Sequence, residues 1–208
     1  MAQKLKEELR TAILEAAREE FLEKGYRNAS MRSIAEKAGM TVGNLYRYFP
    51  SKEDINHSIV APTLEKIDRI LKELTADNVS METHVFTLKA DISELIQLMK
   101  QLSGRLTEVY EENKIEFNIL MMNSQLNKGI TEWFAKAINT LIDQHYLMEG
   151  FSNEKQILSR TYAVSIFSGM KEIFRFSDLN AEDRERIIST YLCSYIYLLD
   201  SDFRKMVR

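Results

Sequence analysis

The sequence predicts an all-α protein, and its composition and the spacing of its apolar residues support this prediction. Two prolines and seven glycines are few for 208 residues, while Leu, Ile, Glu, Lys, Ala and Met are abundant, a balance that favours helix over sheet. Apolar residues recur every three or four positions, and neither β-alternation nor an internal repeat stands out. Because 45% of the residues are hydrophobic, the chain can bury a sizeable core.

The first element is an amphipathic helix over residues 4–24, with charged residues on its other face. Gly25 follows Lys24 at the position where glycine commonly terminates a helix, and Tyr26 is the apolar residue that often closes such a cap. The inward positions are Leu5, Leu9, Ile13, Ala16, Ala17 and Phe21.

Two short helices should follow. Ser30 is a good N-cap for a helix over 31–38, and Gly39 ends that helix. Thr41 can cap a third helix over about 42–48, which Pro50 prevents from continuing.

The fourth helix should start at a capping box in which Ser51 is the N-cap and Asp54 replaces the usual Glu or Gln. It could run to about residue 75. Pro62 lies inside it, so we expect a kink near 58–62 or a short break there.

The rest of the chain is helical with fewer boundary signals. We expect a connector at 77–83, helices at about 81–102, 105–122, 127–148 and 153–175, and a last helix at about 181–200 that Asn180 can cap. The division between two all-α regions should lie within 50–56, giving expected domains of 1–52 and 53–208.

Several classes of protein are disfavoured. The N-terminus is charged throughout and has no signal-like apolar run, and the longest nearly apolar run, 191–199, is too short to span a bilayer. A lone cysteine, Cys193, excludes an internal disulfide framework and fits a reducing compartment. We therefore expect a cytoplasmic protein without a membrane segment.

Charge is distributed unevenly along the chain. The net charge is −3, yet residues 27–52 contain five basic residues and one acidic residue. A local excess of +4 is compatible with a nucleic-acid partner although the chain as a whole is acidic.

Two short helices joined by a tight turn, after a longer first helix, are typical of a helix-turn-helix that binds double-stranded DNA. At 100° per residue, a Leu45 that faces inward brings Tyr48 and Phe49 toward the same side. Gly43 and Arg47 then point away, flanked by Asn44 and Tyr46, with Thr41 at the start of the helix.

This outer face has residue types suited to DNA. Gly43 permits close approach of the backbone, Arg47 can pair with guanine, and Asn44 can pair with adenine. Tyr46, Ser30 and Lys52 are better suited to phosphates, through a hydroxyl, a helix start and a point charge.

Residues 13–55, "ILEAAREEFLEKGYRNASMRSIAEKAGMTVGNLYRYFPSKEDI", resemble the DNA-binding domain of the TetR family of bacterial transcriptional repressors. The resemblance implies a homodimer that binds a palindromic operator, and a variable helical C-terminal domain that binds a small-molecule ligand and dimerises through its last two long helices. The positions that match the family's DNA contacts are Ser30, Met31, Thr41, Val42, Gly43, Asn44, Tyr46, Arg47, Tyr48 and Lys52.

Two positions depart from the family pattern. Tyr48 stands where many members have histidine, and its hydroxyl can still donate to a phosphate. Met31 stands where threonine is common, so only its backbone N–H could serve. Tyr48 and Phe49 can also be explained as packing residues.

The methionine- and aromatic-rich segment 110–134 is a candidate ligand pocket, because methionine adapts to irregular apolar shapes and Trp133 offers a flat stacking face. A stripe of this kind can equally be plain core. The candidate lining residues are Phe117, Met121, Trp133 and Phe134.

The last two helices carry candidate dimer residues. One face of 153–175 has small residues four apart, which permit close helix crossing, and the last helix is apolar on more than half its circumference. Sequence alone does not separate core from dimer interface here. The candidates are Leu158, Tyr162, Ser165, Gly169, Ile188, Leu192, Tyr195 and Leu199.

Catalysis is not expected. His57, His84 and His145 lack metal-ligand spacing, and no phosphate-loop or hydrolase motif occurs, so we expect no enzyme, no cofactor and no metal site. The favoured hypothesis is a repressor that a small-molecule ligand releases from DNA, although activation remains open. The alternative is a helical binding module that keeps the helix-turn-helix only as a scaffold.

Overall fold

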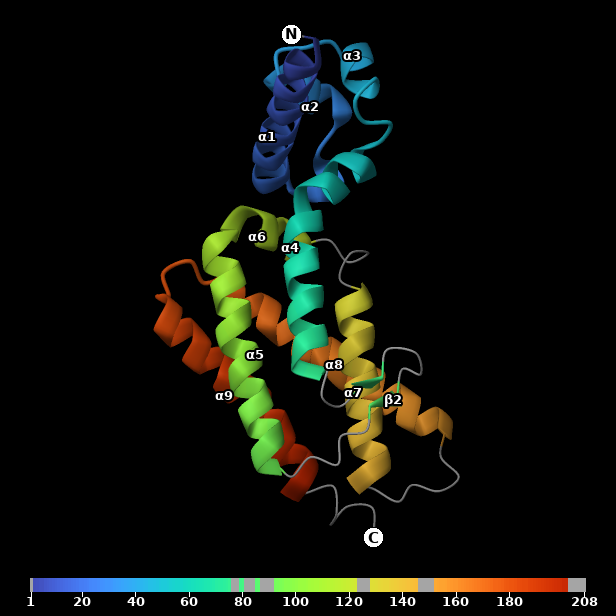
Figure 1. The fold of residues 1–208 in the computed structure, drawn as a ribbon, viewed down its shortest axis with the longest axis vertical. Coiled ribbons are helices and arrows are strands. Elements are labelled where there is room, and N and C mark those ends of the chain that lie inside the picture. Colours follow the sequence, from blue (N-terminus) through green and yellow to red (C-terminus); the bar gives the residue numbers. More distant parts are fainter. Residues whose placement is uncertain are drawn as a thin grey trace. The chain divides into compact units, whose positions relative to one another are not determined.

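The computed structural model describes residues 2–75, 79–80, 85–86, 92–122, 128–145 and 152–201, and within them it confirms the all-α prediction (Figure 1). The strands are two residues long each and pair in antiparallel fashion. In chain order the elements are α1 Ala2–Asn28, α2 Met31–Lys37, α3 Val42–Tyr46, α4 Lys52–Thr75, β1 Val79–Ser80, β2 Val85–Phe86, α5 Ile92–Glu112, α6 Lys114–Met122, α7 Lys128–His145, α8 Ser152–Arg175 and α9 Ala181–Ser201.

The chain forms two compact units. The first comprises Met1–Lys66 and Asn113–Ser124, and the second comprises Ile67–Glu112 and Gln125–Arg208. α6 therefore belongs to the N-terminal unit, so the chain passes between the units within α4 and again before and after α6. The expected division into functional domains at 1–52 and 53–208 remains a prediction.

The caps of the first unit agree with the sequence. The Ser30 hydroxyl accepts from the Ser33 N–H at 3.0 Å, and the Thr41 hydroxyl accepts from the Asn44 N–H at 3.2 Å. Ser51 accepts from the Asp54 N–H at 3.1 Å and donates to the Asp54 carboxylate at 2.6 Å. These side chains satisfy N–H groups that a helix start leaves without partners.

Two glycines shape the connections of this unit. Gly25 has φ +72° and ψ 157°, so the straight part of α1 ends there, and residues 26–28 form a separate helical turn beyond the kink. Gly39, between α2 and α3, has φ +66°. Both positions are strained for residues with a side chain, which explains why the sequence has glycine at each.

The proline in α4 does not break the helix. Lys52–Thr75 is continuous with Pro62 inside it, so the expected break is not found. Ile59, Thr63 and Ile67 are buried at intervals of four residues, and burial of this face offsets the hydrogen bond that the proline removes.

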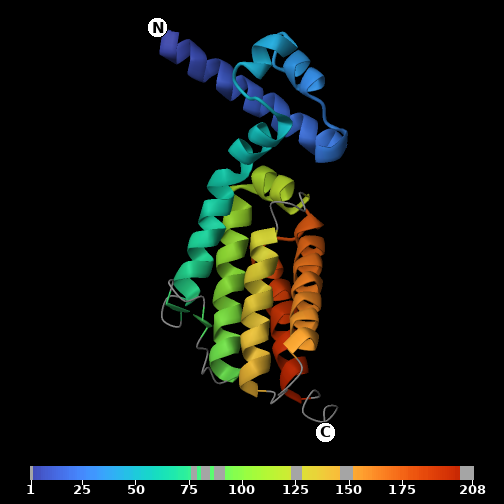
Figure 2. The same ribbon diagram turned by 90° about the vertical axis from the view of Figure 1, so that its right-hand side faces the viewer.

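The second unit is a bundle in which α5, α7, α8 and α9 lie alongside one another (Figure 2). α7 packs against α8, α5 against α9, and α8 against α9. A buried arginine of α9 joins two of these helices: the Arg184 guanidinium donates to the carbonyls of Ile173 at 3.1 Å, Phe176 at 2.9 Å and Leu179 at 3.1 Å. Arg184 thereby caps the end of α8 and the turn that follows.

Two predicted boundaries in this region are wrong. α5 begins at Ile92 and not near residue 81, since Val79–Ser80 and Val85–Phe86 pair as strands in that region. α5 also continues through Ser103 and Gly104 to Glu112, whereas a boundary was expected at 102–105. A Cβ on Gly104 would lie 3.2 Å from the Glu185 carboxylate, so this glycine serves contact with α9 and does not end the helix.

The last two helices match the prediction closely. α8 and α9 begin within one residue of the expected positions, and the Asn180 side chain accepts from the Asp183 N–H at 2.8 Å as a cap. Among the described residues, no helix has the length and apolar character needed to cross a membrane.

Candidate nucleic-acid interface

Buried apolar residues on one side of α3 hold this helix in place. Leu45 is fully buried and Phe49 is 3% exposed, as the helical spacing predicted. The N–H groups of Tyr48 and Phe49 both donate to the Leu45 carbonyl, at 2.9 and 3.1 Å, so the chain turns directly after the helix. This anchoring fixes the opposite face of α3 toward the outside.

That opposite face is accessible. Thr41, Gly43, Tyr46 and Arg47 are exposed, and Tyr46 retains 49% of its accessible surface. A Cβ built on Gly43 meets nothing within 4 Å, and its φ is not in the left-handed region. The fold itself therefore does not require glycine at position 43, which leaves close approach of another molecule as a reason for it.

The remaining predicted residues of this surface have mixed accessibility. Val42, Asn44 and Tyr48 are half-buried. At the start of α2, Ser30 is exposed and Met31 is half-buried. The structure thus brings together at α2 and α3 all the predicted contact residues except Lys52.

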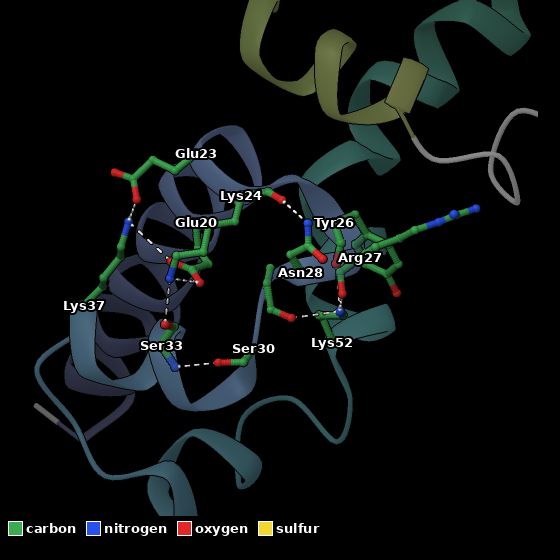
Figure 3. A network of polar contacts seen from close by, with 11 residues as sticks. Glu20, Glu23, Lys24, Tyr26, Arg27, Asn28, Ser30, Ser33, Lys37 and Lys52 are labelled. Carbon is green, nitrogen blue, oxygen red and sulfur yellow. Dashed lines mark hydrogen bonds and ion pairs between the residues drawn. The ribbon is translucent and has the colours of Figure 1, made fainter.

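Lys52, at the start of α4, is directed to the corner between α1 and α2 (Figure 3). Its ammonium donates to the carbonyls of Tyr26 at 2.7 Å and Ala29 at 2.9 Å. It also lies 4.6 Å from the centroid of the Tyr26 ring. The side chain is half-buried and engaged within the protein.

A second polar cluster joins α1 to α2 (Figure 3). Glu20 is fully buried, and its carboxylate accepts from Lys24 at 2.7 Å and forms an ion pair with Lys37 at 3.5 Å. Lys37 also donates to Glu23 at 2.6 Å. Burial alone would raise the pKa of Glu20, but hydrogen bonds from Lys24, Ser33 and Lys37 outweigh burial and hold that pKa below its ordinary value.

The sequence did not single out Glu20, although a signal was present. An acid three or four residues after Ala16 and Ala17, and directly before Phe21, lies on the apolar face of α1. A charge on that face needs partners once it is buried.

The five basic residues of 27–52 are therefore not equivalent. Lys37 and Lys52 are bound within the unit. Arg27, Arg32 and Arg47 are exposed, and their guanidinium groups have no polar partner among the described residues; Figure 3 shows the Arg27 side chain extending away from the cluster. Spacing alone could not distinguish the two sets.

The four candidate ligand residues fall into different units. Phe117 and Met121, in α6, are buried in the first unit. Phe134 and Trp133, in α7, belong to the second unit, where Trp133 packs against the Leu95–Ile196 cluster. The four residues therefore do not belong to one unit, and the burial of Phe117 and Phe134 is what a plain core would also show.

The candidate dimer residues divide by burial. Ile188 and Leu192 are at most 2% exposed within one chain, so they belong to the protomer's own core. Gly169 faces Tyr191 of α9, where a Cβ would lie 2.0 Å from the Tyr191 hydroxyl oxygen, so it serves the crossing of α8 and α9. Leu158, Tyr162 and Tyr195 are half-buried and Ser165 is exposed, while the side chain of Leu199 lies outside the described residues.

A hydroxyl cluster also links α8 to α9. The Tyr191 hydroxyl donates to the Ser165 carbonyl at 2.8 Å and lies 3.0 Å from the Tyr195 hydroxyl. Among the described residues no group of three or more His, Cys, Asp or Glu could hold a metal ion; His84 lies outside them.

Apolar side chains remain exposed on the same two helices. Ile157 is 69% and Val164 48% exposed on α8, and Ile187 is 39% and Tyr197 57% exposed on α9. The apolar candidates for a partner surface are thus these residues, whereas Ile188 and Leu192, which the spacing of the stripes favoured, are buried within one chain.

Comparison with known proteins supports this geometry. Residues 13–59 match the family of bacterial regulatory proteins, tetR family. The HTH-type transcriptional repressor KstR of Rhodococcus jostii is 44% identical over 61 residues, 29% of this chain and 29% of that protein. The HTH-type transcriptional regulator UidR of Escherichia coli is 42% identical over 57 residues, 27% of this chain and 29% of that protein. The chain thus matches less than a third of the length of these relatives.

Two solved structures share the fold over most of the chain. NalD, the secondary repressor of the MexAB-OprM multidrug efflux pump in Pseudomonas aeruginosa, is 22% identical with a TM-score of 0.58, over 94% of this chain and 96% of that chain. The TetR family transcriptional regulator PfmR from Thermus thermophilus is 21% identical with a TM-score of 0.51, over 88% and 97%. Residues 13–59, which contain the helix-turn-helix, are thus similar to bacterial regulatory proteins of the tetR family.

Proposed function

We propose that the protein is a sequence-specific DNA-binding transcriptional regulator, and that it acts as a repressor released from a palindromic operator by a small-molecule ligand. The observation that carries the proposal is the outer face of α3. Thr41, Gly43 and Arg47 are exposed above a buried Leu45, on a domain of a family of DNA-binding regulators.

In this proposal α3 enters the major groove. Arg47 reads guanine through two parallel hydrogen bonds and Asn44 reads adenine, while Val42 and Thr41 lie over the neighbouring bases. Gly43 brings the backbone close to the base edges, which accounts for a glycine that has nothing within 4 Å of its Cβ position.

Phosphate contacts surround this helix. Ser30, Tyr46 and Tyr48 can offer hydroxyls, and Met31 a backbone N–H at the start of α2. To these we add Arg27 and Arg32, whose exposed guanidinium groups have no polar partner among the described residues. Lys52, also a candidate from the sequence, is bound to backbone carbonyls of its own unit.

A homodimer would place two copies of α3 on two half-sites. The exposed apolar residues of α8 and α9 support such a partner surface, since burying them against a second copy removes apolar area from water. We assign this surface to Ile157, Val164, Ile187 and Tyr197, with the half-buried Leu158 and Tyr162 at its edge.

Release by ligand requires a difference in affinity. A small molecule bound in the second unit lowers operator affinity only if it binds one spacing of the two α3 helices better than the other. Trp133 and Phe134 remain candidate lining residues there, whereas Phe117 and Met121 lie in the first unit.

The first experiment selects bound sequences from random DNA with the full-length protein, which tests binding, half-site symmetry and spacing together. Arg47→Ala should then weaken binding to the selected operator by about 1–3 kcal/mol and relax specificity at one position. The matched control is Arg69→Ala, an exposed arginine of α4 in the second unit, which should bind as the wild type does.

Two results would contradict the proposal. Equal loss on operator and random DNA would exclude base reading by Arg47. A wild-type affinity without salt dependence would exclude the phosphate contacts and favour the alternative, a helical module that keeps the helix-turn-helix only as a scaffold.

A further inference from the structure

The start of α4 is fastened to the corner between α1 and α2. The Lys52 ammonium lies 2.7 Å from the Tyr26 carbonyl and 2.9 Å from the Ala29 carbonyl, with the Arg27 carbonyl farther off at 3.4 Å (Figure 3). Three carbonyls of one corner thus face a single cation. An ammonium has three N–H donors, so this arrangement uses its hydrogen-bonding capacity.

The kink at Gly25 explains why these carbonyls converge. Gly25 leaves the helical conformation with φ +72°, so the carbonyls that follow lack the regular partners of a continuing helix. A cation at the C-terminal end of a helix is favourable, because the helix dipole places negative partial charge there. Lys52 supplies that cation from a residue more than twenty positions away.

The neighbouring residue completes the attachment. The Tyr26 hydroxyl donates to the Glu53 carboxylate at 2.8 Å, while the Lys52 ammonium lies over the same ring. The hydrogen bond from Tyr26 holds the pKa of Glu53 below its ordinary value, and burial together with Glu53 raises the pKa of Tyr26 to about 12. The first two residues of α4 therefore both contact Tyr26: Lys52 contacts its carbonyl and ring, and Glu53 accepts from its hydroxyl.

The corner between α1 and α2 directly precedes α2, the first of the two short helices of the helix-turn-helix. Ala29, whose carbonyl Lys52 holds, is 5% exposed and precedes Ser30, the N-cap of α2. A displacement of the start of α4 therefore moves the start of α2, and α3 follows α2 through a short turn. The attachment by Lys52 and Glu53 therefore joins the start of α4 to the residues that directly precede α2.

We propose that Lys52 is a positioning residue: it fixes α4 to the α1–α2 corner, and so places α2 and α3 on operator DNA, without contacting a phosphate. The inference rests on the proposed DNA-binding function. A phosphate contact would require the ammonium to leave the two carbonyls at 2.7 and 2.9 Å, which would then be left without this donor in a half-buried corner.

The test measures the affinity of full-length Lys52→Met for the selected operator and for random duplex over a range of salt concentrations, at a temperature where circular dichroism shows the variant folded. Loss of one positive charge should weaken binding to both DNAs slightly and alike. Operator affinity should fall about tenfold further than random-duplex affinity, and the slope of log K against log salt should not change. Arg32→Met is the control: loss of a phosphate contact should reduce the slope by about 0.9 per contact.

The variant Glu53→Met provides an independent test, because electrostatics alone and a positioning role predict opposite changes in operator affinity. It removes a negative charge from the DNA-binding unit, so electrostatics alone predicts tighter binding to both DNAs. A positioning role predicts weaker operator binding, since Tyr26 loses its acceptor. This variant also keeps the proposal testable if Lys52→Met does not fold.

Three outcomes would overturn the inference. A reduced slope with equal loss on both DNAs would make Lys52 a phosphate contact. A lower melting temperature with unchanged operator affinity would make the attachment a matter of stability alone. Absence of salt-dependent binding by the wild type, measured first, would remove the proposed function and this role together.

Discussion

At the scale of single residues, Glu20 shows how a buried charge connects two helices. Its carboxylate is fully buried between Lys24 of its own helix and Lys37 of α2. Glu20→Gln should lower the free energy of unfolding by about 1–3 kcal/mol near pH 7, because two lysines lose a charged acceptor and a buried amide replaces it. Urea denaturation followed by circular dichroism measures this difference.

The pH dependence of that difference has a definite sign. The pKa of Glu20 is held below its ordinary value of 4.5, so its stabilising contribution is present above pH 4.5 and is lost as the pH falls through the lower, folded-state value. The gap between wild type and Glu20→Gln should therefore close on acidification. Glu19→Gln, an exposed neighbour, should stay within about 0.5 kcal/mol of wild type. A gap that does not narrow at all as the pH falls below 4.5 would show that the buried carboxylate is not the cause.

Individual side chains also explain why the candidate nucleic-acid interface was only partly predictable from the sequence. Helical spacing around Leu45 was enough to predict which side of α3 faces outward, since a single rotation fixes it. Whether a cation is available depends on which distant residues it meets. Lys52 reaches carbonyls more than twenty residues earlier in the chain, and Lys37 reaches Glu20 and Glu23 of another helix. No local pattern contains that information.

At the scale of elements, boundaries were predictable where capping residues and glycines with positive φ set them. Ser30, Thr41, Ser51 and Asn180 all act as the caps that their residue types suggested. One error arose where a residue serves tertiary packing. The expected boundary at 102–105 includes Gly104, which lies inside α5 and allows the Glu185 side chain to approach that helix.

Gly169 is the clearest element-scale test of that distinction. A Cβ there would lie 2.0 Å from the Tyr191 hydroxyl oxygen and 2.2 Å from the ring carbon that carries it. Gly169→Ala should therefore displace the Tyr191 ring, break its hydrogen bond to the Ser165 carbonyl, and destabilise the protein by about 1–3 kcal/mol in spite of the better helix propensity of alanine.

A matched glycine should respond with the opposite sign. Gly129, in the first turn of α7, has nothing within 4 Å of its Cβ position. Gly129→Ala should be neutral or stabilise by up to about 1 kcal/mol. Thermal and urea unfolding of the two variants measure both effects. Equal behaviour of the two would mean that the α8–α9 crossing does not depend on the absent side chain.

At the scale of the whole molecule, the two compact units differ in how far the sequence predicts their use. The first unit carries a motif whose order and spacing match a family over residues 13–59. The second unit has no such motif, and apolar stripes on its helices look alike whether they face a core, a ligand or another copy. Ile188 and Leu192 were candidates for a partner surface, yet they are buried within one chain.

The apolar side chains that stay exposed within one chain are therefore the residues to change in a test of dimerisation. Ile157 and Val164 are seven positions apart on α8, so they share one face, and they are 69% and 48% exposed. Val164→Glu should leave helix content unchanged but shift the protein toward monomer in sedimentation, because a charge buried against a second copy lacks a partner. Operator affinity should fall as the dimer is lost, since a monomer cannot bind two half-sites at once.

The control for this prediction is an apolar residue of similar exposure in the other unit. Ile115, on α6, is 43% exposed, and Ile115→Glu should leave the sedimentation coefficient at the wild-type value. If Val164→Glu sediments as the wild type does, α8 does not form the partner surface. If both variants become monomeric, the effect reflects added charge and not a specific contact. Loss of the dimer in Val164→Glu alone, together with a drop in operator affinity, would connect the exposed face of α8 to the proposed DNA-binding function of the first unit.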